Sequence, residues 1–157
     1  SGVTCYAHPM RPESTGSVHI RSNDPHTPPT IRFNFLSSPP DVEVAVKAVR
    51  IARAIMTAPT MRALQTEELA PGSDRRSDAE ILEWIKAAGE TTYHPVGTCK
   101  MGQDERAVVD ETLRVRGLAG LRVADASIMP TQISGNTNAP SIMIGEKASD
   151  LVLADVR

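Results

Sequence analysis

Apolar residues recur with a helical period in three stretches of the chain. The first follows Ser38, which we expect to cap a helix that has prolines in its first turn and ends near Pro59. A capping box at Ser77–Glu80 predicts a second helix, and Gly89 is a good stop for it. A third helix is predicted from about Asn138 to Ala154. The expected buried faces are, in order, Val42, Ala45, Val49, Ala52 and Met56; Ile81, Trp84, Ile85 and Ala88; and Ile144, Ala148 and Leu151.

Short strands are predicted in the first part of the chain and in one later segment. Alternation or β-rich composition marks 3–8, 17–21 and 31–35, and a further strand-like run lies at 121–124. The intervening segments are rich in proline, which removes backbone donors. Strands and helices mix without a regular βαβ rhythm, so the predicted class is α+β, an antiparallel sheet backed by helices.

Composition excludes several kinds of partner for this chain of 157 residues. Charged residues make up 23% and the net charge is −2, with no basic stripe, so we expect no nucleic acid partner. No apolar run approaches the roughly 20 residues of a membrane span. No signal peptide is visible and the two cysteines form no CxxC pair, which together favour a cytoplasmic protein with reduced thiols.

Three polar, glycine-containing blocks follow residue 90. They are 92–102 (TYHPVGTCKMG), 120–130 (GLRVADASIMP) and 134–150, which begins SGNTNAP. An imidazole such as that of His94 can accept a proton at neutral pH. An amide such as that of Asn136 cannot act as a base, but it can donate a hydrogen bond to a developing alkoxide. Taken alone, without its flanking motif, His94 is better interpreted as a loop or core histidine bonded to a backbone carbonyl.

In order and spacing, the three blocks resemble the C-terminal region of the glucose–methanol–choline (GMC) flavoprotein oxidoreductases, most closely the choline dehydrogenase-like branch. The strong resemblance covers residues 91–155 and a weaker one covers 11–16. At 31–35, where members often have an acid–Pro–Asn–Tyr run, only Asn34 matches well, so a different pocket is expected there.

The resemblance implies an FAD-dependent dehydrogenase or oxidase that acts on the CH–OH group of a small alcohol. In such an enzyme the carbinol hydride passes to flavin N5. His94 would take the hydroxyl proton, and Asn136 would stand where members have a second histidine or an asparagine. The start of the last helix would lie against the flavin. Cofactor contacts are expected from Tyr93, Asp125, Ala126, Asn136, Thr137 and Asn138.

The other histidines and the methionines have plainer interpretations. His8, His19 and His26 share no helical face and have no carboxylate or thiol at metal-ligand spacing, so we expect surface or strand histidines and no metal site. The methionines are read as aliphatic filler.

The resemblance also predicts the domain organisation. Residues 1–110 would form the substrate-binding portion, and 111–157 would return to the FAD-binding domain. No G-x-G-x-x-G follows a strand, so the pyrophosphate-binding part is expected in a missing N-terminal part of the same protein, without which the chain would be inactive. The alternative is a cofactor-free binding or interaction module that retains the fold. We also expect the isolated chain to self-associate, as a dimer or aggregate, through exposed Ile142, Ile144 and Leu151.

Overall fold

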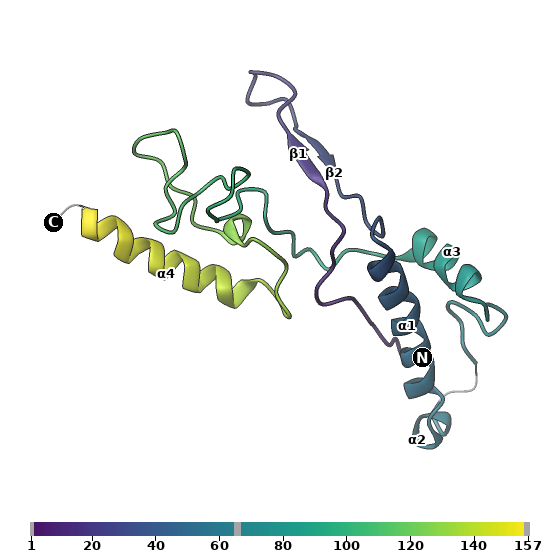
Figure 1. The fold of residues 1–157 in the computed structure, drawn as a ribbon. Coiled ribbons are helices and arrows are strands. Elements are labelled where there is room, and N and C mark those ends of the chain that lie inside the picture. The colour runs from purple at the N-terminus through teal and green to yellow at the C-terminus, as the bar shows by residue number, and fades with distance from the viewer. Residues whose placement is uncertain (1, 65–66, 156–157) are drawn as a thin grey trace. The chain divides into compact units, whose positions relative to one another are not determined.

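The computed structural model describes residues 2–64 and 67–155, and these form two compact units. One unit contains the chain up to residue 16 together with 32–91, and the other contains 17–31 together with the chain from residue 92. The elements are labelled in Figure 1: β1 (Ser17–His19), β2 (Thr30–Arg32), α1 (Pro39–Met56), α2 (Pro59–Arg62), α3 (Asp78–Ala88) and α4 (Asn138–Asp155), with the 3-10 helix η1 (Ala126–Ile128) between α3 and α4.

Helix α1 begins where the sequence predicts, but Ser38 does not cap it with its side chain. The prolines at 39 and 40 have no N–H to donate, and the N–H of Asp41 bonds to the Ser38 carbonyl at 3.1 Å. The Ser38 hydroxyl instead donates to Glu13 Oε2 at 3.3 Å. Asp41, buried in the first turn, accepts the backbone N–H groups of Glu13 at 2.9 Å and Ser14 at 2.8 Å. The first turn of α1 therefore holds the segment around residues 13 and 14.

Helices α1 and α3 pack against each other, and their apolar faces form the core of the first unit. Ala45 and Val46 are buried on α1, and Ile81 on α3 is fully buried. The predicted capping box is confirmed, since Ser77 Oγ accepts the Glu80 N–H and the Glu80 carboxylate accepts the Ser77 N–H. Ala88, which was predicted to be buried, is exposed, so the packed face ends one turn before the helix does.

The strands are shorter than the sequence predicts. Segment 3–8 is not a strand, because no strand within residues 2–64 and 67–155 lies beside it to pair with. The predicted 31–35 strand is observed as β2, which ends at Arg32. Asn34 and Leu36 have φ angles of 57° and 56°, and this left-handed backbone cannot continue a strand. The Asn34 amide donates to the Thr15 carbonyl at 3.0 Å, which fixes the turn.

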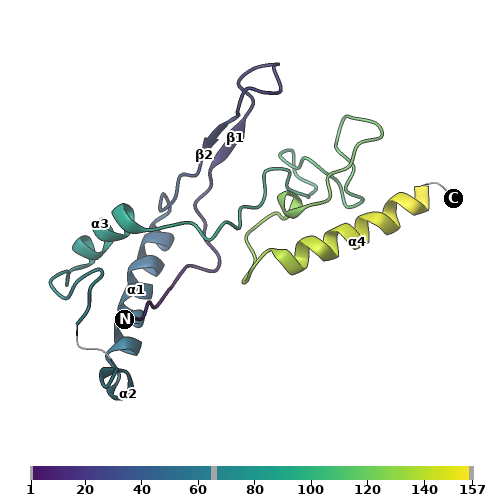
Figure 2. The same ribbon diagram turned by 180° about the vertical axis from the view of Figure 1, so that it is seen from behind.

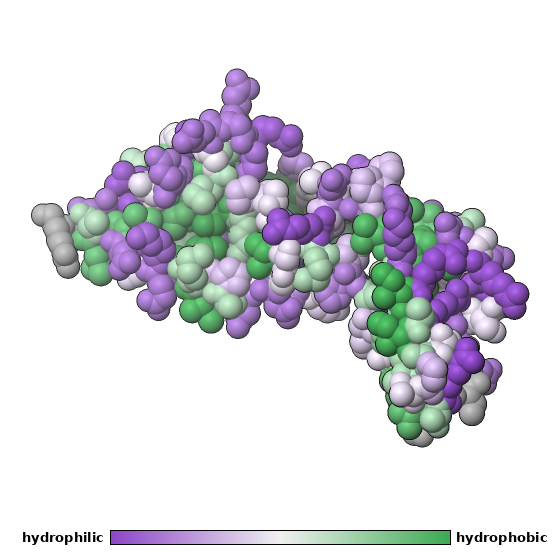
Figure 3. Space-filling model, turned by 60° about the horizontal axis from the view of Figure 1, so that its bottom comes forward, coloured by the Kyte–Doolittle hydropathy of each residue, from purple (hydrophilic) through white to green (hydrophobic). Residues whose placement is uncertain are grey.

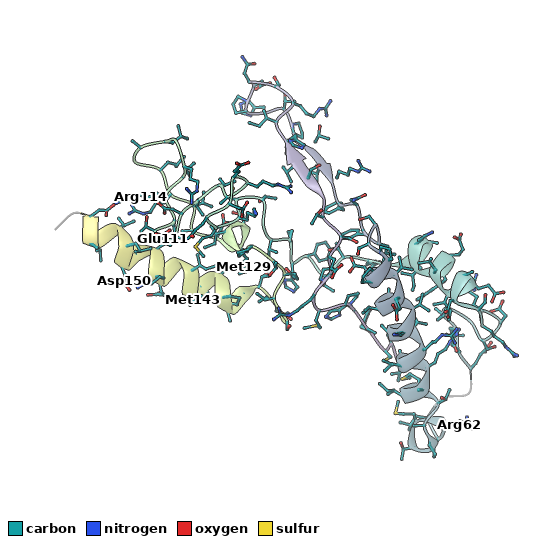
Figure 4. The ribbon with its side chains drawn as sticks, in the orientation of Figure 1. Arg62, Glu111, Arg114, Met129, Met143 and Asp150 are labelled. Carbon is teal, nitrogen blue, oxygen red and sulfur yellow. The ribbon has the colours of Figure 1, made fainter. Side chains whose placement is uncertain are left out.

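The second unit is built on α4, which lies alongside the irregular segments that precede it in both views (Figures 1 and 2). Figure 4 places Met129 beside the N-terminal half of α4 and Arg114 towards its C-terminal end, where Arg114 and Arg122 both bond to Asp155. The buried cluster consists of Val109, Leu113, Ile128, Met129, Ile144 and Ala148, with Leu151 packed against it. The packing face predicted for the last helix is confirmed.

That packing corrects one part of the expected self-association surface. Ile144 is only 6% exposed within the chain, because it belongs to the cluster, whereas Ile142 is 61% exposed. Other apolar side chains are open as well, and Figure 3 shows hydrophobic residues (green) at the surface of both units.

The class contains both helices and strands as predicted, but its sheet is small. Within residues 2–64 and 67–155 there is one antiparallel sheet of two strands, and the packed pairs of elements are α1 with α3, α1 with α2, and α4 with η1. A helix layer behind the sheet is therefore not seen in the described ranges. No helix in this part of the chain is long and apolar enough to cross a membrane.

Candidate active site

His94 and Thr137 are joined by a hydrogen bond, with His94 Nδ1 2.9 Å from Thr137 Oγ1. The two residues are 43 positions apart, and both are half-buried. The bond brings together the first and third of the polar blocks found in the sequence. The other ring nitrogen of His94, Nε2, has no hydrogen-bonding partner among the residues that the structure describes.

The segment that carries His94 is held by two left-handed positions and by pairing with the η1 segment. Tyr93 has φ 61° and Gly97 has φ 86°. A Cβ atom at Gly97 would lie 3.3 Å from the Met129 carbonyl oxygen, so only glycine suits both the backbone angle and the close approach. Beyond this turn the Cys99 N–H donates to the Ser127 carbonyl at 3.0 Å. The segment that carries His94 is thus anchored to η1 through the backbone of Cys99.

Thr137 directly precedes α4 and occupies the position that a capping residue takes. Its carbonyl accepts the N–H of Ser141 at 3.0 Å, the first bond of the helix, and also the Ser141 hydroxyl at 2.6 Å. Residue 140, at the third helical position, is proline and has no N–H. The Thr137 hydroxyl is therefore directed to His94 while the Thr137 backbone begins the helix.

Asn136 and Asn138 flank Thr137, and both are exposed. Neither amide side chain has a hydrogen-bonding partner within the described ranges. The structure thus places predicted site residues 136–138 at the His94 contact, although only Thr137 touches the imidazole through a hydrogen bond.

Asp125 and Ala126 lie at the start of η1. Asp125 Oδ1 accepts the Ser127 N–H at 2.8 Å and so caps this short helix, and Ala126 packs against the buried cluster. They are connected to the His94 segment through the backbone pairing of Ser127 with Cys99. Tyr93 is 79% exposed beside His94.

Gln132 is a polar residue that the sequence did not single out. Its Oε1 atom is buried and has no hydrogen-bonding partner in the described part of the chain. Buried polar atoms are nearly always paired in native proteins, so this carbonyl oxygen calls for a donor from outside the described residues. Burial of one side-chain atom leaves no signal in a single sequence.

The polar groups at 132–139 have the donor and acceptor chemistry that one edge of an isoalloxazine ring, with its carbonyl acceptors and N–H donor, would require. The N–H groups of Asn138 and Ala139 lie at the positive end of α4, where carbonyl oxygens and negative charge are favoured. The Asn136 and Asn138 amides add donors, and Gln132 Oε1 adds a buried acceptor. By contrast, no group of three or more His, Cys, Asp or Glu side chains suited to a metal ion occurs within the described residues.

Comparison with known proteins supports the resemblance seen in the sequence. The GMC oxidoreductase family model matches residues 12–145. The oxygen-dependent choline dehydrogenase of Klebsiella pneumoniae (strain ATCC 700721 / MGH 78578) is 49% identical over 96% of this chain, which corresponds to 27% of the relative. That of Cronobacter sakazakii (strain ATCC BAA-894) is 49% identical over 95% of this chain and likewise 27% of the relative. The chain therefore spans about a quarter of the length of these relatives.

Solved structures agree with this comparison. An FAD-dependent oxidoreductase from Chaetomium thermophilum matches 94% of this chain and 26% of its own, with a TM-score of 0.89 and 34% identity. Pyridoxine 4-oxidase from Mesorbium loti matches 90% of this chain and 28% of its own, with a TM-score of 0.85 and 35% identity. The family model, the relatives and the structures lead to one conclusion: this chain belongs to the GMC oxidoreductase family and corresponds to its C-terminal domain.

Proposed function

We propose that this chain supplies the catalytic, substrate-side part of an FAD-dependent alcohol oxidoreductase, with His94 as the general base. The observation that carries the proposal is the His94–Thr137 hydrogen bond. It joins the histidine to the polar start of α4, it engages Nδ1, and it leaves Nε2 free to meet a substrate hydroxyl.

The chain's own residues account for the proton chemistry of alcohol oxidation. His94 Nε2 accepts the proton of the substrate hydroxyl, because a neutral imidazole is a base near neutral pH. Asn136 has an exposed amide next to Thr137, and that amide can donate a hydrogen bond to the alkoxide oxygen as the proton leaves. Bound FAD would supply the hydride acceptor.

The N-terminal end of α4 and the residues beside His94 would hold the cofactor. The N–H groups at Asn138 and Ala139 and the amide side chains at 136 and 138 suit the carbonyl edge of the flavin ring. Tyr93, Asp125, Ala126 and Thr137 complete the proposed set. In this arrangement residues 1–110 form the substrate-binding portion, and residues 111–157 belong to the FAD-binding domain. An N-terminal part of the same protein binds the pyrophosphate of FAD.

Choline, pyridoxine and an aryl alcohol are the first substrates to test. The relatives named above are choline dehydrogenases, and the matched structures include pyridoxine 4-oxidase and a fungal aryl-alcohol oxidase, which is 32% identical with a TM-score of 0.81. Choline comes first, because the relatives that carry its name have the higher identity.

The test uses the full-length protein that carries this chain. Its visible spectrum is recorded, and it is then mixed without oxygen with choline, pyridoxine or benzyl alcohol. We expect bound flavin and bleaching by at least one of these alcohols. A full-length protein that folds but binds no flavin would overturn the proposal and favour a cofactor-free interaction module.

A further inference from the structure

We infer that Thr137 is a positioning residue that fixes the ring orientation and tautomer of His94. This inference rests on the proposed function, because it concerns how His94 acts as a base. The observation is the 2.9 Å contact between His94 Nδ1 and Thr137 Oγ1, together with the absence of any other hydrogen-bonding partner for the imidazole within residues 2–64 and 67–155. The hydroxyl of Thr137 is thus the polar group that holds the ring.

The tautomer that His94 requires follows from which ring nitrogen must accept the substrate proton. For Nε2 to accept the substrate proton it must carry the lone pair, so the ring proton of neutral His94 resides on Nδ1. The Nδ1–H then donates to Thr137 Oγ1, whose lone pairs make it an acceptor. When Nε2 has taken the proton, both nitrogens carry hydrogen, and the same bond becomes charge-assisted and stronger. Thr137 therefore stabilises the product of proton transfer more than the reactant.

The sequence at the start of α4 explains why the threonine hydroxyl is available. A threonine at this position ordinarily accepts the N–H of the second or third helical residue. The third residue here is Pro140, which has no N–H, and the Ser141 N–H and hydroxyl both bond to the Thr137 carbonyl. The proline removes one of the two N–H groups that would compete for the hydroxyl. The threonine backbone begins the helix, while its side chain serves His94.

The position of the pair also limits ring motion. His94 and Thr137 are both half-buried, and the Thr137 backbone is anchored by two bonds to Ser141. Thr137 is β-branched, which restricts its side chain to few orientations. Loss of the hydroxyl would leave a half-buried Nδ1–H without an acceptor and would permit the tautomer with the proton on Nε2, which cannot act as the base.

The test compares Thr137→Val and Thr137→Ser in the flavin-loaded, full-length protein. Valine keeps the shape and the backbone bonds but removes the hydroxyl, whereas serine restores it. Rapid mixing with the best alcohol gives the limiting rate of flavin reduction and the alcohol dissociation constant. We expect Thr137→Val to lower the limiting rate about 10- to 100-fold with little change in the dissociation constant, because the lost bond is to a charged group. Thr137→Ser should stay within about 3-fold of the wild type.

A second variant keeps the hydroxyl in place and changes its surroundings. Pro140→Ala gives residue 140 an N–H that competes for Thr137 Oγ1, so we expect flavin reduction to slow by about 3- to 10-fold. A wild-type rate of flavin reduction in Thr137→Val, with flavin bound, would overturn the inference. A parallel His94→Asn variant separates the two proposals: if it is inactive while Thr137→Val is normal, the base survives and the positioning role fails. If His94→Asn is normal, the proposed function itself fails.

Discussion

Arg53 of α1 and Glu68 form a forked ion pair, with Arg53 Nε 3.0 Å and Nη2 2.9 Å from Glu68 Oε1. The pair is largely shielded, since the two side chains are only 21% and 27% exposed. The same guanidinium donates to the carbonyls of Gly72 at 2.8 Å and Arg75 at 2.7 Å. One side chain therefore holds the loop that precedes α3 against α1.

Replacing Arg53 with alanine should release that loop. The partly buried Gly72 carbonyl, the exposed Arg75 carbonyl and the Glu68 carboxylate lose their donor. We expect a local loss of about 1–3 kcal/mol. Trypsin cleavage after Arg75 and Arg76 should then become about 5- to 150-fold faster, because opening of the segment becomes that much more frequent.

Two further variants control for charge. Arg53→Lys keeps the charge but cannot form the fork, so its cleavage rate should lie between those of the wild type and Arg53→Ala. Arg62, labelled in Figure 4, is exposed on α2, and Arg62→Ala should cleave like the wild type. Equal cleavage of the wild type and Arg53→Ala would contradict the assigned role of Arg53.

Asp41 makes the first unit sensitive to acid. Burial raises the pKa of Asp41, but hydrogen bonds from the Ser14 side chain and from the backbone of Glu13 and Ser14 together outweigh burial and lower it below its ordinary value of 3.8. A lowered folded-state pKa means that Asp41 contributes its full stability above the ordinary value. That stability is lost as the pH falls through the lower, folded-state pKa.

Thermal unfolding of the wild type and Asp41→Asn measures this contribution. At pH 7 we expect the variant to be about 1–3 kcal/mol less stable, since a neutral amide oxygen replaces a carboxylate that accepts two N–H groups. The difference should shrink as the pH falls below 3.8, because the Asp41 carboxylate of the unfolded wild type is protonated there and that of the folded protein only at lower pH. Asp74→Asn, at an 83% exposed side chain, should follow the wild-type pH profile. A pH-independent difference for Asp41→Asn would refute the assignment.

Gly97 should be more important for activity than its backbone angle alone implies. Gly97→Ala places a left-handed alanine 3.3 Å from the Met129 carbonyl and shifts the segment that carries His94. Gly117 has a similar φ of 80° but open space around its Cβ position. We expect each alanine variant to lose about 1–2 kcal/mol of stability from the backbone, and only Gly97→Ala to slow alcohol-driven flavin reduction. Equal rates in the two variants would show that the Met129 contact is unimportant.

The helices were predictable because their signals are local. The Ser77–Glu80 capping box and the spacing of Ile144 and Ala148 specify helix and buried face within a few residues. The strands were less predictable, because a strand depends on a distant partner, and segment 3–8 has none in the described structure. The Ser38 side chain was misassigned for a similar reason, since its bond to Glu13 crosses 25 residues.

In the candidate site, too, local motifs were predictable from the sequence, whereas contacts between distant residues were not. His94 and the Asn136–Asn138 block were found from their motifs, and the sequence assigned Thr137 to the cofactor. Its contact with His94 crosses 43 residues and required coordinates. Gln132 escaped notice because the burial of Oε1 depends on packing that no local pattern records.

The central claim is that His94 is the base, and flavin reduction in the full-length protein tests it most directly. The variants are His94→Asn and, as the matched control, His26→Asn, which alters an exposed histidine of the β1–β2 loop. Both should bind flavin. We expect His26→Asn to be reduced by the alcohol at the wild-type rate and His94→Asn to be reduced about 100- to 10,000-fold more slowly, the range for loss of general base catalysis. Reduction of flavin-loaded His94→Asn at the wild-type rate would contradict the account.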